Sequence, residues 1–233
     1  MKIVKQYTGQ EALRALTDRL INLMNQKSER RFNLALSGGE TAKQMFVLWT
    51  DEYRELLNWG RLHFYWVDER CVPPDDPESN YGHAERLLFH PLTISSHHIH
   101  RIQGENDPEQ EAVRYAAEVN NSVPQLDGQP HFDCIILGVG NDLHTASIFP
   151  STMSLLTDER SFVISTHPQS GQMRVTMTGS VLLNQTPLLV PVIGSGKAAV
   201  VAALENDFEQ QHPVPAVYVL SKAADATLFT ETL

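Results

Sequence analysis

The sequence predicts an α/β fold, a three-layer sandwich in which helices cover both faces of a mostly parallel sheet. Three observations favour this fold class. Apolar runs such as residues 32–36 (FNLAL) and 188–193 (LLVPVI) are continuous rather than alternating, as expected of strands buried on both faces. Amphipathic helical patterns stand between these runs, and the connections are short. Strands that alternate with helices in this way predict a twisted, Rossmann-like sheet.

The first half of the chain alternates between helical and strand patterns. Residues 10–27 place apolar side chains three and four positions apart, which is typical of an amphipathic helix. Residues 32–36 and 62–67 (LHFYWV) are expected strands. The remaining expected elements are a helix after Thr41 that runs through Trp49, a short helix at 81–89, a candidate strand within 96–102, and a helix over 108–120.

The second half is organised around the stretch from Phe132 to Pro150 (FDCIILGVGNDLHTASIFP). An apolar strand, residues 132–137, leads there through a glycine turn into a polar cluster. The other expected elements are strands at 162–165, 174–178 and 188–193, a helix at 198–204, and a final strand at 216–220.

We expect a single domain over residues 1–233. The chain has 233 residues, of which 42% are hydrophobic, so it can bury a sizeable core. It shows no linker, internal repeat or low-complexity tract that would divide it.

The charge balance argues against nucleic acid or an anionic membrane as a partner. The formal net charge is −10 and the pI is near 5.4, whereas both partners attract basic patches. Cys71 and Cys134 are too few to cross-link a chain of this length, and no apolar stretch has signal-peptide or membrane-spanning length. We therefore expect reduced thiols, a cytoplasmic location, and a monomer or weak homodimer that binds a small molecule.

Residues 37–41 (SGGET) connect the strand at 32–36 to a helix, which is a phosphate-loop arrangement. Gly38 and Gly39 allow the backbone to approach a ligand closely, while free amides and the helix dipole favour an anion. The alternative is a simple turn, in which the glycines supply positive φ and Thr41 caps the helix. The loop alone leaves both interpretations open.

Charged residues follow two other expected strands. Asp68 and Arg70 come directly after residues 62–67, and Lys197 follows residues 188–193. In open α/β sheets ligands bind beyond the carboxyl ends of the strands, so these side chains are expected near one another. A solvated surface lysine is the alternative for Lys197.

Two nucleotide-binding patterns are incomplete. Residues 194–197 (GSGK) are similar to a P-loop, but Pro191 stands where its first glycine belongs and Ala198 where its Ser or Thr belongs. Residues 138–140 (GVG) begin a dinucleotide fingerprint, yet Leu143 takes the place of the third glycine. Nucleotide hydrolysis is therefore rejected.

Asp142 and His144 follow the strand at 132–137 and could act as an orienting carboxylate and a general base. The alternative is a structural histidine. Candidate anion-binding groups at three other strand ends favour the catalytic interpretation. No serine lies in a G-x-S-x-G pattern, so a covalent serine mechanism loses its usual signature.

His97, His98 and His100 suggest a metal, but no carboxylate or cysteine lies at ligand spacing from them. A surface strand is the preferred interpretation of this segment. We predict no required metal.

Several segments together, in this order along the chain, resemble the 6-phosphogluconolactonase family of the glucosamine-6-phosphate isomerase/deaminase superfamily. The resemblance covers nearly the whole sequence. Leu143 stands where the family usually has a glycine between its Asp and His. A leucine would be strained there if that position needs positive φ. Glu40 and Ala42 also replace the family's more usual small residue and proline. The matching segments are SGGET (37–41), VDERCVPPDDPESNYG (67–82), GVGNDLHTASIFP (138–150), RVTMTGSVLLN (174–184) and GSGKAAVVAAL (194–204).

The resemblance implies hydrolysis of 6-phospho-D-glucono-1,5-lactone to 6-phosphogluconate without a cofactor. It implies that His144 is the general base for a water molecule, and that Asp142 orients His144 or contacts substrate hydroxyls. A lactone needs only an activated water, a stabiliser for the oxyanion and a phosphate site. The residues implied to bind substrate or phosphate are Ser37, Gly38, Gly39, Thr41, Asp68, Arg70, Arg174 and Lys197.

Two rival functions stay open. The sister activity, isomerisation with deamination of glucosamine 6-phosphate, is carried by a branch whose histidine segment ends in an Asn-Glu pair, whereas this chain has Phe149 and Pro150. A sugar-phosphate sensor without catalysis is the other rival. Such a regulator would carry a DNA-binding module, and this acidic chain has no spare basic helix-turn-helix segment.

Overall fold

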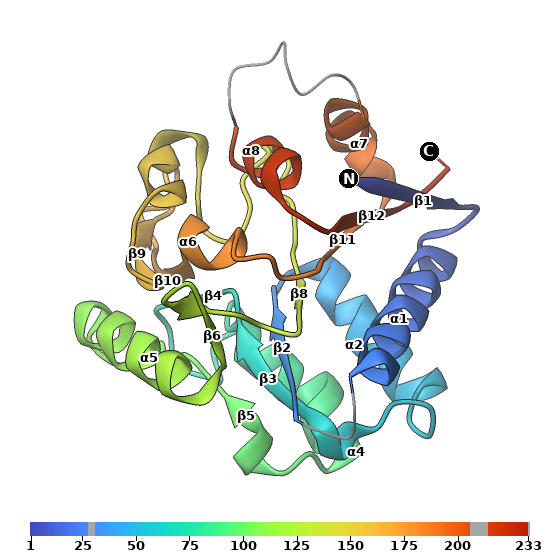
Figure 1. Ribbon diagram of the computed structural model, residues 1–233, viewed down its shortest axis with the longest axis horizontal. Coiled ribbons are helices and arrows are strands. Elements are labelled where there is room, and N and C mark those ends of the chain that lie inside the picture. The colour runs from blue at the N-terminus through green and yellow to red at the C-terminus, as the bar shows by residue number, and fades with distance from the viewer. Residues whose placement is uncertain (28–30, 206–213, 233) are drawn as a thin grey trace.

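The computed structural model describes residues 1–27, 31–205 and 214–232. Its centre is a seven-stranded sheet in which every neighbouring pair of strands is parallel (Figure 1). The mostly parallel sheet predicted from the sequence is therefore confirmed. In spatial order the strands are β1 (Lys2–Gln6), β12 (Ala226–Glu231), β11 (Leu188–Val192), β8 (Cys134–Ile136), β2 (Phe32–Leu36), β3 (Leu62–Trp66) and β5 (Ile99–His100).

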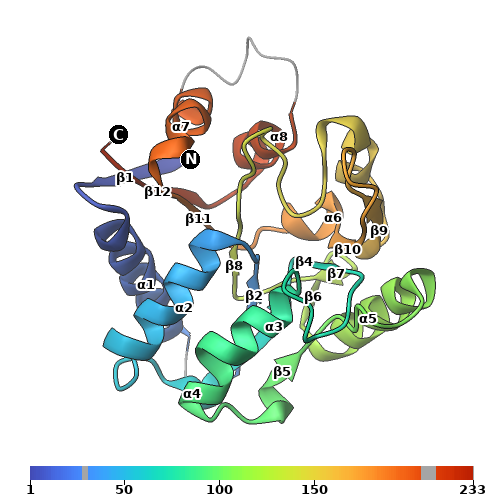
Figure 2. The ribbon, with the colours of Figure 1, turned by 180° about the vertical axis from the view of Figure 1, so that it is seen from behind.

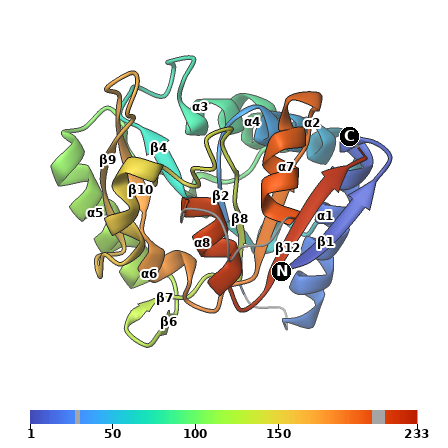
Figure 3. The same ribbon diagram turned by 90° about the horizontal axis from the view of Figure 1, so that it is seen from above.

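Helices cover both faces of the sheet. The views from behind and from above show α2 and α3 on one face and α6 and α8 on the other (Figure 2, Figure 3). Among the described helices, none combines the length and the apolar character needed to cross a bilayer. The helices are α1 (Gly9–Gln26), α2 (Glu40–Glu52), α3 (Asn80–Ala84), α4 (His90–Leu92), α5 (Pro108–Ser122), α6 (Gly179–Leu182), α7 (Ala198–Glu205) and α8 (Pro215–Lys222).

Helix α1 shows how local sequence determines an element. Thr8 and Glu11 form a capping box at its start, which satisfies amide groups that would otherwise lack partners. One stripe of the helix is buried, at the spacing of three and four that the sequence predicts. The buried residues are Ala12, Leu13, Leu16, Thr17, Leu20, Leu23 and Met24.

A second, antiparallel sheet lies beside the central one. It consists of β4 (Asp68–Arg70), β10 (Met173–Met177) and β9 (Phe162–Thr166), with β10 in the middle. The strands expected at 162–165 and 174–178 are thus confirmed, but they belong to this smaller sheet. A two-stranded hairpin, β6 (Gln125–Leu126) and β7 (Gln129–Pro130), completes the strands.

Some expected elements are wrong or incomplete. Residues 216–220 are part of helix α8 rather than a strand, because Pro215 occupies its first turn and its apolar side chains join the core. The sequence patterns also miss β1 and β12. Within 96–102, a 3₁₀ turn at Ser96–His98 precedes a strand of only two residues.

The topology marks one point on the sheet edge for ligand binding. From β2 the chain proceeds to β3 and β5, whereas from β8 it proceeds to β11 and β12 on the opposite side. Neighbouring strands β2 and β8 therefore form a topological switch point. Ligands of open α/β sheets bind outside the carboxyl ends of the strands at such a point.

Candidate active site

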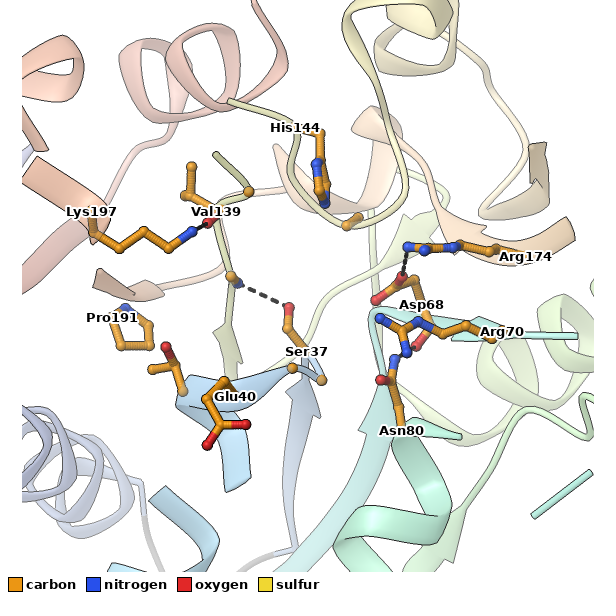
Figure 4. Close-up of a pocket in the computed structure, with 16 residues that line it drawn as sticks. Ser37, Glu40, Asp68, Arg70, Asn80, Val139, His144, Arg174, Pro191 and Lys197 are labelled. Carbon is orange, nitrogen blue, oxygen red and sulfur yellow. Dashed lines mark hydrogen bonds and ion pairs between the residues drawn. The ribbon is translucent and has the colours of Figure 1, made fainter. Parts of the chain in front are cut away.

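A cavity of about 240 Å³ lies at the carboxyl ends of β2 and β8 (Figure 4). Every predicted site residue except Asp142 lines it, although these residues come from distant segments of the chain. The lining residues are Ser37, Gly38, Gly39, Glu40, Thr41, Asp68, Arg70, Asn80, Gly138, Val139, Gly140, His144, Ala146, Arg174, Pro191 and Lys197.

The two glycines of the glycine loop, residues 37–39, differ in conformation. Gly39 has a φ of +93° and is the N-cap of α2, where no side chain caps the helix. Thr41 lies in the first turn rather than at the cap, so the expectation that Thr41 caps the helix is wrong, whereas Gly39 does supply a positive φ. The first amides of α2 lack capping partners and bring the positive end of the helix dipole to the cavity. This arrangement suits an anion.

Asp142 is hydrogen-bonded to His144 within the His144 loop, residues 138–147. The Nδ1 atom of His144 lies 2.5 Å from Oδ1 of Asp142, so Nδ1 carries a proton, and in the neutral imidazole Nε2 is the acceptor. The imidazole points into the cavity (Figure 4). Burial opposes ionisation of Asp142, but the charge and hydrogen bond of His144 prevail and lower the pKa of Asp142. The pair has the geometry of a base and its orienting carboxylate.

Gly140 makes room for this imidazole. A methyl group added at Gly140 would overlap Cε1 and Nδ1 of His144 and would crowd Oδ1 of Asp142. The amide of Gly140 also donates to the carbonyl oxygen of His144 at 2.9 Å, which closes the turn. The loop is therefore packed tightly around the ring.

Leu143 has a φ of +63° and Ala146 a φ of +52°, so two residues of this loop are left-handed without being glycine. Such a conformation costs about 1–2 kcal/mol per residue. The strain expected for Leu143 is therefore confirmed. Its side chain packs against the core, and its carbonyl oxygen accepts a hydrogen bond from Ala216 of α8 at 3.0 Å. These contacts hold the strained loop in place.

Three cationic side chains converge on the cavity from different elements. Arg70 on β4 and Arg174 on β10 lie directly opposite each other, and Lys197 follows β11. Like charges at opposed positions repel unless an anion lies between them. Burial lowers the pKa of Arg174 and of Lys197, and the buried Nε atoms of both arginines have no hydrogen-bond partner among the described residues. The cavity is therefore suited to bind an anion.

Asp68 compensates part of this positive charge. Its Oδ2 accepts a hydrogen bond from Oγ of Ser147 at 2.5 Å and lies 3.9 Å from Nη1 of Arg174. The Oγ of Ser147 also accepts a hydrogen bond from Nη1 of Arg174 at 3.3 Å. Lys197 is held separately, because its Nζ donates to the carbonyl oxygen of Val139 at 2.9 Å. The cations are therefore fixed before any ligand binds.

The candidate site residues named from the sequence omit Asn80, Ser147 and Phe149. Asn80 lines the cavity, and the guanidinium carbon of Arg174 lies 5.7 Å from the centre of the Phe149 ring. The same ring lies 4.9 Å from that of His144. All three residues fall inside the segments 67–82 and 138–150, but their residue types give no sign of these contacts.

The described residues contain no cluster of three or more His, Cys, Asp or Glu side chains suited to hold a metal ion. Two of the histidines in segment 97–100 instead stack with His63 beside edge strand β5. The ring centres of His98 and His100 lie 4.5 and 5.4 Å from that of His63.

Comparison with known proteins agrees with this geometry. Residues 7–229 match the family model of glucosamine-6-phosphate isomerases/6-phosphogluconolactonase. The chain is 38% identical to a 6-phosphogluconolactonase of Treponema pallidum, over 88% of this chain and 86% of that one. It is 40% identical to the enzyme of that name from Haemophilus influenzae, over 82% and 80%.

A solved structure also matches. The crystal structure of a protein named devB is 37% identical in sequence, with a TM-score of 0.88 and coverage of 99% of this chain and 95% of that one. The chain therefore belongs to the glucosamine-6-phosphate isomerase/6-phosphogluconolactonase family.

Proposed function

We propose that this protein hydrolyses 6-phospho-D-glucono-1,5-lactone to 6-phospho-D-gluconate in the oxidative pentose phosphate pathway. The observation that carries the proposal is the presence, in one cavity, of a histidine oriented by Asp142 and of three cationic side chains. The names of the two relatives above support the choice of substrate. A phosphorylated lactone has a carbonyl carbon for a water molecule activated by the histidine to attack, and a phosphate for the cationic side chains to bind.

His144 acts as the general base. Its Nε2 accepts a proton from water as the water oxygen attacks the lactone carbonyl carbon, and Asp142 stabilises the resulting imidazolium. The tetrahedral oxyanion then collapses, the bond from the carbonyl carbon to the ring oxygen breaks, and His144 returns the proton to that oxygen. No covalent intermediate and no cofactor enter this scheme.

The glycine loop and the cations bind the phosphate and stabilise the developing negative charge. Free amides at the start of α2, with Ser37 and Thr41, form one side of this anion site. Arg70, Arg174 and Lys197 form the other. Asp68, which is anionic, suits a substrate hydroxyl rather than the phosphate.

The test is a rapid assay of lactone opening against the uncatalysed rate. His144→Gln should lower kcat by about 10²–10⁴-fold, the usual contribution of a general base, with KM little changed. His97→Gln, a change at an exposed histidine, is the matched control and should keep wild-type kinetics. Near-normal turnover of His144→Gln would exclude this mechanism, and ammonia release from glucosamine 6-phosphate would favour the sister activity instead.

A further inference from the structure

Glu69 is a buried carboxylate that faces the protein rather than the cavity. Its side chain is 2% exposed although it lies between two cavity residues, Asp68 and Arg70. It joins the end of β4 to the start of α3 across the loop between them. Its carboxylate accepts hydrogen bonds from the amides of Arg70 (2.8 Å), Asn80 (2.8 Å) and Tyr81 (2.7 Å) and from the hydroxyl of Ser79 (3.2 Å).

Asn80 extends this connection to the glycine loop. Its Nδ2 donates to the carbonyl oxygen of Asp68 at 2.9 Å, which fixes the orientation of the amide group. Its Oδ1 is buried and has no hydrogen-bond partner among the described residues. The amide group instead fills the space in which a side chain at Gly38 would begin, so a methyl there would overlap Oδ1 and Cγ.

This contact explains why residue 38 is a glycine. Gly38 does not have a left-handed φ, unlike Gly39, and around Gly39 an added methyl would meet nothing within 4 Å. Residue 39 is therefore a glycine because of its positive φ, whereas residue 38 is a glycine because the Asn80 side chain lies so close to its backbone. The side chain of Asn80 on helix α3 therefore packs directly against the backbone of the glycine loop.

Asn80 and Arg70 thus lie on one side of the cavity, facing the glycine loop (Figure 4). The guanidinium of Arg70 is itself held by the loop that Glu69 closes, because its Nη1 donates to the carbonyl oxygen of Glu78 at 2.5 Å. A shift of this loop would move the arginine and the glycine-loop amides relative to each other.

We propose that Glu69 and Asn80 are positioning residues that set the distance between Arg70 and the amides of the glycine loop, and so determine the affinity for the substrate phosphate. The inference rests on the proposed function in treating this cavity as a phosphate site. Glu69 does not line the cavity, Asn80 lines it beside Arg70 (Figure 4), and both act through Arg70 and Gly38.

The first test replaces Glu69 by glutamine, which has the same shape but carries an NH₂ donor in place of an oxygen that accepts from at least one backbone amide. Glu69→Gln and Asn80→Ala should each weaken binding of inorganic phosphate about tenfold in calorimetry and raise KM for the lactone by a similar factor. The kcat value and its pH profile should stay within about threefold of wild type, because His144 and Asp142 are untouched.

Asp133→Asn is the matched control. Asp133 is also 2% exposed and also accepts a hydrogen bond from a backbone amide, that of Asn33 at 2.7 Å, but it lies at the opposite edge of the sheet. This change should lower the melting temperature without changing phosphate affinity. If Glu69→Gln and Asn80→Ala behaved like this control, their role would be structural only and the proposal would fail.

The second test does not depend on Glu69→Gln folding. Gly38→Ala alone should weaken phosphate binding at least about tenfold, because its methyl displaces the Asn80 amide. Adding Asn80→Ala removes the atoms in its way, so the double variant should bind phosphate no worse than Asn80→Ala alone. If the losses of phosphate affinity in the two single variants simply added in the double variant, the proposal would be overturned.

These readouts separate the two claims. Calorimetry with inorganic phosphate reports on the positioning residues even if the wild-type protein does not accelerate lactone opening. Absence of that acceleration would count against the proposed function alone, whereas unchanged phosphate affinity in an active enzyme would count against Glu69 and Asn80 alone.

Discussion

At the scale of single residues, the imidazole of His144 depends on the missing side chain of Gly140. The ring occupies the place where a Cβ would lie, and its Nδ1 reaches Asp142 from that position. Displacement of a catalytic group by about 1 Å can cost about 10²-fold in rate. Under the proposed function, Gly140 contributes to catalysis by leaving room for the imidazole rather than by its backbone freedom.

We expect Gly140→Ala to lower kcat by about 10²-fold, with the protein still folded, because the methyl group pushes the imidazole away from Asp142. Gly138→Ala is the matched control in the same loop, since its methyl would meet Ser37 at an ordinary contact distance of 3.5 Å. Steady-state kinetics of both variants make the comparison. Equal losses in the two variants would contradict the role assigned to Gly140.

Residues at strand ends could be predicted from the sequence because parallel strands share a carboxyl edge. Arg70, His144 and Lys197 were found in this way and line the cavity, whereas Arg174 came from the family resemblance. The contact between Asn80 and Gly38 could not be predicted. It depends on the approach of the Asn80 side chain to the backbone at Gly38, which no local pattern of residue types records.

At the scale of elements, helix α8 supports the strained His144 loop. The amide of Ala216, in the first turn of α8, donates to the carbonyl oxygen of Leu143, and the leucine side chain packs against the core. Burial of an apolar side chain offsets a left-handed φ that a glycine would adopt without cost. Leu143 therefore costs conformational energy in the loop, but its side chain fixes the loop to the core.

Two substitutions separate these effects. Leu143→Ala keeps the left-handed strain and loses the packing, whereas Leu143→Gly loses the packing but relieves the strain. Both should destabilise the protein, and Leu143→Gly should be the more stable of the two by about 0.5–1 kcal/mol, contrary to the usual order of Ala and Gly. Chemical denaturation measures the difference. If the alanine variant is the more stable one, Leu143 is not strained.

The elements that sequence reasoning misassigned have a common cause. Residues 216–220 are a short apolar run, and periodicity alone cannot distinguish such a run in a strand from a buried helical turn. The proline at 215 was the available sign of a helix start. Strand β1 escaped detection because it lies at the sheet edge and is largely exposed, so it lacks the apolar run of a central strand.

At the scale of the whole molecule, a histidine network stabilises the far edge of the sheet. His100 lies at its centre: its Nδ1 is 3.0 Å from Oε1 of Glu118, so its Nε2 is left to accept from His63 at 3.1 Å and from Arg31 at 3.2 Å. Burial, followed by the charge of Arg31, lowers the pKa of His63 to about 4. The folded state therefore favours the neutral imidazole.

This network predicts a loss of stability in acid. The ordinary pKa of a histidine is about 6.5, so unfolded His63 binds a proton before folded His63 does. Its contribution is present above pH 6.5 and disappears as the pH falls from 6.5 towards 4. After allowance for solvent screening, we expect this contribution of His63 to the free energy of unfolding to be about 1–2 kcal/mol.

Melting temperatures at pH 7 and pH 5 test this expectation. The decrease between the two should be smaller in His63→Gln than in wild type by about 2–6 °C, given the size of the chain. His97→Gln, at an exposed position, should follow the wild type. Identical acid dependence in all three proteins would mean that His63 titrates normally.

The overall class of fold could be predicted from alternating apolar runs and helices, but the division into two sheets could not. Strands β9 and β10 have patterns compatible with either sheet. Their place in the smaller sheet follows from the pairing of β9 with β10 and from three residue pairs between β10 and β4, among them Arg174 opposite Arg70. Such register depends on contacts between distant segments of the chain. The sequence therefore could not predict that Arg70 on β4 and Arg174 on β10 lie opposite each other.

The pairing of β1 with β12 has a consequence for the order of folding. Among the described strands β1 has β12 as its neighbour in the sheet, with Lys2 opposite Thr227 and Gln6 opposite Glu231. Strand β1 is therefore synthesised long before β12, the strand with which it pairs. Until β12 is synthesised β1 lacks this partner, and it is then the segment that a chaperone would be best placed to shield during translation.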